Sequence, residues 1–132
     1  MHNDLKDRYK GGCLLERITS LNTVQQWNEV LSASRVKPLL VFKHSSRCSV
    51  STGAYDELTA WLEDAGELSP PCFLVEVVDH QELSRAIAEQ AGIKHESPQA
   101  LLIENGMVSW HASHWGITYS TLDDHLGNHC EK

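Results

Sequence analysis

The residue best suited to chemistry is Cys48, which stands between an apolar run and an amphipathic segment. Residues 39–42 predict a buried strand and those after Cys48 a helix, so the thiol falls at the expected helix start. Free N–H groups and the positive end of the helix dipole favour a thiolate at such a position. Lys43, His44 and Arg47 add positive charge nearby. We therefore interpret Cys48 as an activated thiol.

The alternative for Cys48 is a small buried hydrophobe, which is the commoner state of a free cysteine. Its polar neighbours Ser45, Ser46 and Ser49 speak against an apolar site, so the reactive interpretation is preferred. Cys72 opens a second apolar run and is expected to be structural. No two cysteines have Cys-x-x-Cys spacing, so neither a zinc ribbon nor a dithiol centre is predicted. A zinc site among the eight histidines is a weak hypothesis.

Composition and length limit the class of protein. The 132 residues suit one domain, and the formal net charge of −7 argues against nucleic-acid binding, which needs a basic surface. No apolar run approaches the length of a membrane span, and the N-terminus lacks the layout of a signal peptide. We therefore expect a cytoplasmic protein without membrane contact. Residues 1–12 predict a flexible N-terminal arm, and residues 13–132 a single domain.

Hydrophobic periodicity predicts alternating strands and helices. The first expected elements are a short strand near Leu14–Ile18 and a helix over Thr19–Ser34, which is capped by Asn22 and turns Val24, Trp27, Val30 and Leu31 toward the core. A strand at 39–42, the helix after Cys48, a strand at 72–78 and a helix that is capped by Asp79 and ended by Gly92 follow. The last elements are strands at 100–104 and 107–111, joined by the turn Asn105–Gly106, and a helix capped by Thr118. This order predicts an α/β fold. Its central mixed sheet of about five strands is expected to be flanked by helices on both faces.

The order of elements resembles the thioredoxin fold, with a cysteine at the start of the second helix and a proline before the next-to-last strand. The Cys-x-x-Cys motif of thioredoxins would fall at residues 48–51, where Ser51 replaces the second thiol. The buried carboxylate that serves the second thiol in thioredoxins would fall at Phe42. The resemblance implies a monothiol, thioredoxin-like protein whose nucleophile is Cys48.

Three segments resemble the monothiol bacilliredoxin family (YtxJ-type proteins) more closely, namely 43–48, 92–99 and 110–115. The last two contain the strings Lys-His-Glu-Ser-Pro-Gln and Trp-His-Ala-Ser-His-Trp. The resemblance implies a cytoplasmic bacterial protein that removes bacillithiol from mixed disulfides with protein cysteines. Bacillithiol is a low-molecular-weight thiol that some bacteria use in place of glutathione. No bound cofactor is implied, and bacillithiol or another thiol would recycle Cys48.

The resemblance implies that the Ser97–Pro98 bond is cis and lies opposite Cys48. The Ser97 backbone would then pair with an extended substrate. Ser51, the second expected catalytic residue, either donates a hydrogen bond to the Cys48 thiolate or is an ordinary first-turn residue. No metal ligand is assigned.

Three more residues are expected to bind substrate. Arg47 either attracts the carboxylates of bacillithiol or lies in solvent. His114 and Trp115 follow the last strand, in the loop that faces the active site in thioredoxins, and would flank the low-molecular-weight thiol. Trp110 is expected to pack in the core, and His95 and His111 to be surface or hydrogen-bonded residues.

Two rival functions remain open at this point. One is a non-catalytic thioredoxin-like module that binds peptides beside Pro98, or senses redox state, with Cys48 as a passive thiol. The other is a monothiol protein that binds a metal or an iron–sulfur cluster through Cys48. Reactivity of Cys48 separates an oxidoreductase from the first rival, and a metal assay separates it from the second.

Overall fold

The computed structural model describes residues 18–127. The expected N-terminal arm, Cys13 and Cys130 lie outside these residues. The strands are β1 (Ile18–Ser20), β2 (Leu39–His44), β3 (Cys72–Glu76), β4 (Gln99–Glu104) and β5 (Met107–Ser113). The α-helices are α2 (Val24–Ala33), α3 (Ser49–Ala65), α4 (Gln81–Ala91) and α5 (Tyr119–Leu122). Two short 3₁₀-helices, η2 (Gly66–Leu68) and η3 (His114–Gly116), and a π-helical turn, η4 (Asp123–Gly127), complete the fold.

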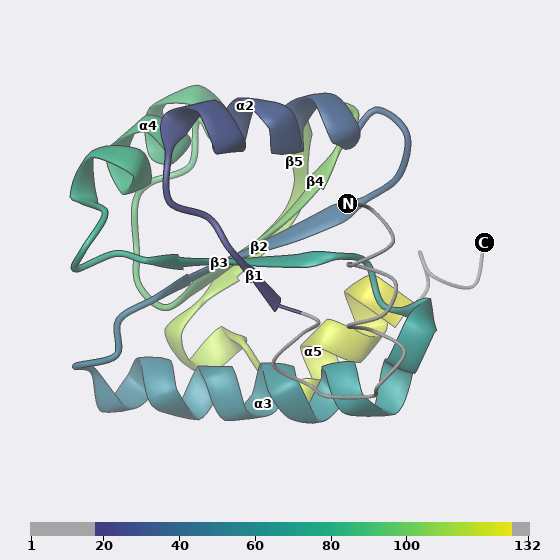
Figure 1. The fold of residues 1–132 in the computed structure, drawn as a ribbon. Coiled ribbons are helices and arrows are strands. Elements are labelled where there is room, and N and C mark those ends of the chain that lie inside the picture. The colour runs from purple at the N-terminus through teal and green to yellow at the C-terminus, as the bar shows by residue number, and fades with distance from the viewer. Residues whose placement is uncertain (1–17, 128–132) are drawn as a thin grey trace.

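The five strands form one mixed sheet in the order β1-β3-β2-β4-β5. β1 and β2 run parallel to β3, whereas β4 is antiparallel to β2 and β5 is antiparallel to β4. Helices α2 and α4 cover one face of the sheet, and α3 and α5 cover the other (Figure 1). This arrangement confirms the predicted α/β fold with helices on both faces.

The turn between β4 and β5 is the predicted hairpin. Asn105 and Gly106 have φ values of 54° and 77°, so both central residues occupy the left-handed region. Asn and Gly tolerate that region best, which is why this dipeptide indicates a two-residue hairpin.

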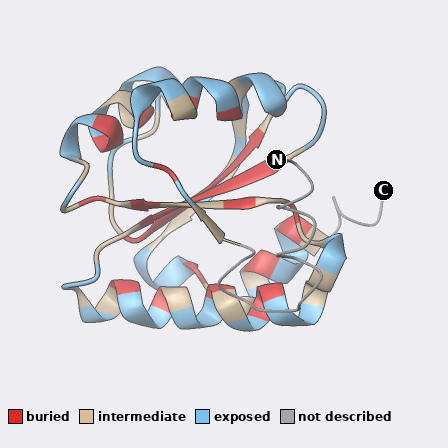
Figure 2. Ribbon diagram, viewed as in Figure 1, coloured by how far each residue is buried: buried red, intermediate tan, exposed pale blue. Residues whose placement is uncertain are grey.

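Strand β2 lies at the centre of two hydrophobic clusters. Leu40 and Phe42 face α3 and the C-terminal helix, while Leu39 and Val41 face α2 and α4. All four side chains are buried, as are the inner sides of the helices (Figure 2). The apolar run on both faces of β2 therefore reflects burial on both sides.

The first helix begins later than the sequence predicted. Thr23, not Asn22, is the N-cap, and Gln26 completes a capping box with it. The Leu21 amide donates to the Leu74 carbonyl at 2.8 Å, and the Leu21 side chain is buried. The chain therefore stays extended through Leu21, and Val24 lies at the solvent-facing start of the helix, 37% exposed instead of in the core.

The start of α4 is also shifted by one residue. The Asp79 and His80 amides both donate to the Glu76 carbonyl, at 3.2 and 3.0 Å. This tight turn after β3 makes His80, rather than the predicted Asp79, the N-cap residue. Gly92 ends the helix in the left-handed conformation, as predicted.

Candidate functional site

Four segments of the chain meet at one edge of the sheet, on the left in Figure 1. His44 at the end of β2 pairs with Glu76 at the end of β3. Gln99 at the start of β4 pairs with Lys43 on one side and with Ser113 of β5 on the other. The loops that carry Cys48, Pro98 and His114 therefore all leave the sheet at this edge.

Cys48 is the N-cap residue of the 17-residue helix α3. Its backbone is extended (φ −113°, ψ 125°), and its side chain is partly exposed. The Cys48 amide donates to the Ser45 carbonyl at 3.1 Å, and the Thr52 amide donates to the Cys48 carbonyl at 3.1 Å. The predicted position of the thiol, at the positive end of a helix dipole, is thus confirmed.

Two hydrogen bonds hold the loop before Cys48. The fully buried Ser51 accepts from the Ser45 amide through its Oγ at 3.2 Å. Glu76 Oε2 on β3 accepts from the Ser46 amide, also at 3.2 Å. In the described contacts, the Ser51 hydroxyl orients the loop, and donation from Ser51 to the thiolate stays a prediction.

The Ser97–Pro98 peptide bond is cis, as expected. Pro98 is buried, and its carbonyl accepts from the His114 amide at 3.0 Å. This hydrogen bond connects the loop before β4 with the loop after β5. Ser97 Oγ is buried and has no hydrogen-bond partner among residues 18–127.

The turn η3 places His114 and Trp115 next to the loop that contains Pro98. His114 has a φ of 52°, and its Nδ1 lies 3.6 Å from Glu96 Oε1. A hydrogen bond from Ser113 is the main reason why the pKa of Glu96 is lowered, and the charge of His114 adds to it. The Trp115 side chain is 79% exposed.

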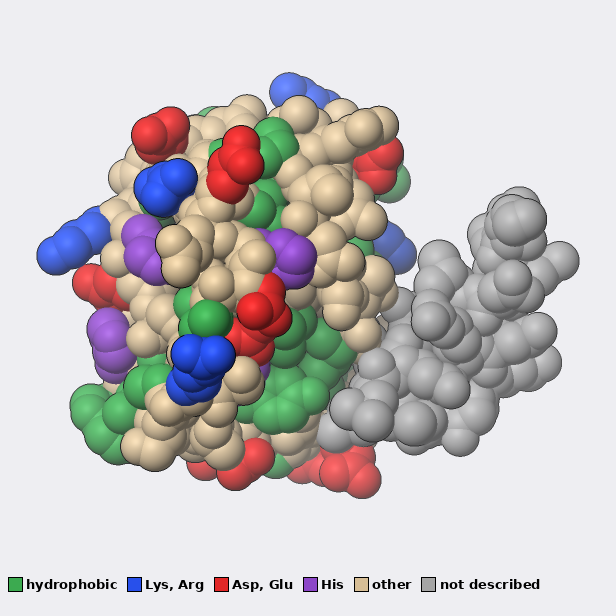
Figure 3. All heavy atoms as spheres, turned by 60° about the vertical axis from the view of Figure 1, so that its left-hand side comes forward, with side chains coloured by type: hydrophobic (Ala, Val, Ile, Leu, Met, Phe, Trp, Pro, Cys, Tyr) green, Lys and Arg blue, Asp and Glu red, His purple; other side chains and the backbone are tan. Residues whose placement is uncertain are grey.

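Figure 3 turns this side of the molecule toward the reader. Histidine side chains lie there among acidic and basic ones, next to hydrophobic side chains. This mixture contrasts with the two hydrophobic clusters between the helices and the sheet.

The positive charge expected around Cys48 is distributed differently from the prediction. Arg47 is exposed. Lys43 instead points to the face of the sheet opposite α3, where its Nζ lies 3.0 Å from His95 Nδ1 and 3.2 Å from Gln99 Oε1. Burial lowers the pKa of Lys43 to about 8. Strand alternation explains the difference, because adjacent residues of β2 face opposite sides.

His44 also departs from the prediction. Its ring packs against those of Phe42 and Tyr55, with centroid distances of 5.8 and 5.2 Å, and these two rings lie 6.3 Å from each other. Burial lowers the pKa of His44, and the charge of Glu76 opposes this effect only in part. His44 is therefore mainly neutral at pH 7 and adds no full positive charge beside Cys48.

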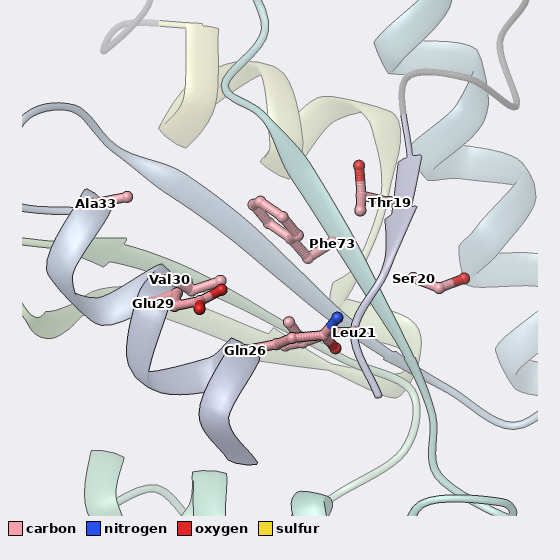
Figure 4. A pocket seen from close by; sticks show the side chains of 8 residues that line it. All are labelled: Thr19, Ser20, Leu21, Gln26, Glu29, Val30, Ala33 and Phe73. Atoms are coloured by element: carbon pink, nitrogen blue, oxygen red, sulfur yellow. The ribbon is translucent and has the colours of Figure 1, made fainter. Parts of the chain in front are cut away.

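A pocket of about 290 Å³ lies away from these loops, between α2 and the strands β1 and β3 (Figure 4). Its lining includes Leu21, Val30 and Phe73 and none of the residues predicted to react or bind substrate. Within residues 18–127, no three His, Cys, Asp or Glu side chains are grouped so that they could hold a metal ion. No helix in this part of the chain is long and apolar enough to cross a membrane.

Solved structures show the class of protein. A structure described as a suspected oxidoreductase with a thioredoxin fold matches with a TM-score of 0.75 and 28% identity, over 90% of this chain and 97% of that one. The thioredoxin of Fasciola hepatica (TM-score 0.65, 15% identity, 84% of this chain and 98% of that one) shares the fold. So does mitochondrial thioredoxin 3 of Saccharomyces cerevisiae (TM-score 0.64, 13% identity, 92% and 98%). These matches place the protein in the thioredoxin-fold class.

The family follows from the sequence match. The model of the monothiol bacilliredoxin BrxC family matches residues 19–122. The chain therefore belongs to the monothiol bacilliredoxin family, as its motifs indicated.

Proposed function

We propose that this protein removes bacillithiol from mixed disulfides with protein cysteines, using Cys48 as its only nucleophile. The observation that carries the proposal is the placement of Cys48 at the N-terminus of α3, at the same sheet edge as the cis Ser97–Pro98 bond. Ser51 occupies the position of a second thiol. Membership in the monothiol bacilliredoxin family supports bacillithiol as the low-molecular-weight thiol.

The reaction is a thiol–disulfide exchange in two steps. The Cys48 thiolate attacks the bacillithiol sulfur of the mixed disulfide, and the protein cysteine leaves as a thiolate that takes up a proton. Cys48 is then disulfide-bonded to bacillithiol. Because Ser51 has no thiol, a second bacillithiol or another thiol attacks this adduct and restores Cys48. The second step releases a disulfide, so oxidising equivalents pass from the target protein to the recycling thiol.

The surrounding residues would bind the two halves of the mixed disulfide. The Ser97 backbone, presented by Pro98, pairs with an extended segment of the modified protein. Trp115 and His114 flank the bacillithiol moiety, and Trp115 has the exposure that such contact requires. Arg47 is free to approach the carboxylates of bacillithiol from solvent.

Ser51 has a second part in this scheme. Its hydroxyl accepts from the Ser45 amide and so keeps this loop in place. We propose that it also donates to the Cys48 thiolate. The proposed setting is the bacterial cytoplasm, with bacillithiolated proteins as partners and without a bound cofactor. Nucleic acid and membrane are not partners in this scheme.

The test is intact-mass analysis after exposure to oxidised bacillithiol and, separately, to oxidised glutathione, with the modified residue mapped. The proposal predicts one bacillithiol adduct, on Cys48, that forms faster than the glutathione adduct. It also predicts that Cys48→Ala abolishes release of bacillithiol from a modified protein, whereas Cys72→Ala retains it. Release that persists in Cys48→Ala would falsify the proposal.

A second variant examines the monothiol character. Ser51→Cys supplies a thiol three residues after Cys48, so its bacillithiol adduct should convert to an internal disulfide. The adduct mass is then lost without an added thiol, whereas the unmodified chain keeps it. A passive sensor or peptide-binding module would release no bacillithiol from a modified protein at any concentration of recycling thiol.

A further inference from the structure

The buried amino group of Lys43 connects both ends of the segment that contains the cis-proline. The Lys43 side chain is 0% exposed although it belongs to one of the most strongly hydrated residue types. Its Nζ contacts His95, which precedes Pro98 by three residues, and Gln99, which follows Pro98 directly. The segment with the Ser97–Pro98 bond is therefore bracketed by two contacts to one nitrogen.

Gln99 extends this network back to the same segment. Its Oε1 accepts from Lys43 Nζ, and its Nε2 donates to the Lys94 carbonyl at 3.0 Å. Gln99 is itself 2% exposed and pairs with Lys43 in the β2–β4 register. Lys94, His95 and Gln99 are thus all tied, directly or through one residue, to a single side chain of β2.

The charge states of Lys43 and His95 are consistent with the short distance between Lys43 Nζ and His95 Nδ1. An ammonium group only donates hydrogen bonds, so His95 Nδ1 must be the acceptor and the ring must be neutral. Burial is the main reason why the pKa of His95 is lowered. The charge of Lys43 lowers this pKa further, and the charge of Glu96 opposes both effects. A protonated Lys43 therefore helps to keep its own acceptor available at neutral pH.

An apolar side chain would fill this site without the penalty of burying an amine. The chain instead retains a lysine whose pKa falls to about 8 through burial. We propose that Lys43 is a positioning residue whose buried ammonium group fixes residues 94–99, so that the Ser97 backbone is held ready to pair with an extended substrate. Lys43 acts through His95 and Gln99 and is not assigned contact with the reacting sulfurs.

The main test replaces Lys43 by methionine, which is similar in length and cannot donate. Lys43→Met should raise the pKa of the His95 ring, measured by NMR titration, because the neighbouring charge is lost. Amide hydrogen exchange at His114, whose amide donates to the Pro98 carbonyl, should become at least about fivefold faster, because the segment opens more easily. The Tm of Lys43→Met should stay equal or rise, because a buried charge is removed, and this result distinguishes a loosened loop from a damaged core.

Two more variants serve as checks. His95→Ala removes one contact of Lys43 at an exposed position, so it should fold and also accelerate amide exchange at His114. Asp123→Ala is the matched control, because it deletes a part-buried side-chain contact, to Trp61 Nε1, within the cluster on the opposite sheet face. Asp123→Ala should lower the Tm but leave the pKa of His95 and the exchange at the His114 amide unchanged.

An activity measurement extends the test and rests on the proposed function. In Lys43→Met the KM for a bacillithiolated protein should rise about five- to tenfold, while alkylation of Cys48 by iodoacetamide changes less than twofold. An unshifted pKa of His95 together with unchanged exchange at the His114 amide would overturn the positioning role. Absence of bacillithiol release in the unmodified chain would instead overturn the proposed function, because the NMR measurements do not depend on activity.

Discussion

Cys48 and Cys72 are chemically the same residue in two contrasting environments, 24 positions apart. Cys48 is partly exposed at the N-terminus of α3, among polar loop residues. Cys72 begins β3, is 1% exposed in the core cluster, and burial raises its pKa to about 12. A thiolate can form and react only where helix dipole and solvent stabilise it. The comparison shows that backbone position, rather than residue type, determines which thiol can exchange.

The largest expected effect is the difference in alkylation rate between the two thiols. At pH 7 we expect iodoacetamide to label Cys48 at least about a thousandfold faster than Cys72, because Cys72 reacts only when the core opens. Mass spectrometry of digested samples over time measures both rates. In denaturant the two rates should converge. Labelling of Cys72 within tenfold of Cys48 in the folded protein would contradict the comparison.

The next effect concerns stability. Cys72→Ala should lower the free energy of unfolding by about 1–2 kcal/mol at pH 7, because a buried sulfur is lost and a small cavity remains. Cys48→Ala should change it by less than about 0.5 kcal/mol, because the site is partly exposed. Urea unfolding followed by fluorescence measures both values. Equal losses in the two variants would show that both thiols serve packing.

The stability difference between the unmodified chain and Cys72→Ala should depend on pH, which sharpens the comparison of the two thiols. The pKa of Cys72 is raised from 9.0 to about 12, so above pH 9 the unfolded chain loses a proton that the folded chain keeps. The advantage of the unmodified chain over Cys72→Ala should therefore shrink as the pH rises, by up to about 1.4 kcal/mol per pH unit. Lys43 opposes this trend in both proteins, because its lowered pKa makes stability rise with pH above about 8. Taking the difference between the variants cancels the Lys43 contribution.

A smaller effect is expected from the loop that holds Cys48. Ser51→Ala removes the acceptor of the Ser45 amide and should lower the free energy of unfolding by about 1 kcal/mol. It should also slow alkylation of Cys48, because the loop no longer holds the thiol in place. Thr59→Ala is a suitable control, because it removes a local hydrogen bond to the Asp56 carbonyl on the same helix. Unchanged alkylation in Ser51→Ala would restrict Ser51 to packing.

The smallest effect is electrostatic. Arg47→Ala should slow the reaction of Cys48 with oxidised bacillithiol about two- to fivefold at low salt, and the difference should vanish at high salt. Arg85→Ala changes the net charge equally at an exposed position on α4 and should have no such effect. Equal slowing in both variants would assign the effect to overall charge.

Local patterns in the sequence predicted much of the site. The apolar run before Cys48 indicated a central strand, and the break after it indicated a helix start, so the N-cap position of the thiol followed. The turn Asn105–Gly106 and the cap Thr118 were also confirmed. Both rest on interactions within a few residues, which sequence patterns record directly. The predicted N-caps of α2 and α4 were wrong by one residue, because hydrogen bonds to carbonyl groups of β3 delay the start of both helices.

The placement of charges could not be predicted in the same way. Lys43 and His44 are adjacent to the loop in sequence, and for that reason both were assigned to Cys48. In the folded chain Lys43 contacts His95 and Gln99, and His44 packs against the rings of Phe42 and Tyr55. The signal available beforehand was a lysine directly after four apolar strand residues, which indicates burial but not the partner.

The sequence by itself determined the order of strands and helices, the family, and the position of one cysteine at a helix start, because these depend on local periodicity and short motifs. Only the tertiary structure decided which face each β2 side chain occupies, which thiol is excluded from solvent, and which residues fix the segment around Pro98. Those properties arise from contacts between residues far apart in the sequence, such as Lys43 and Gln99, and from the burial that accompanies them.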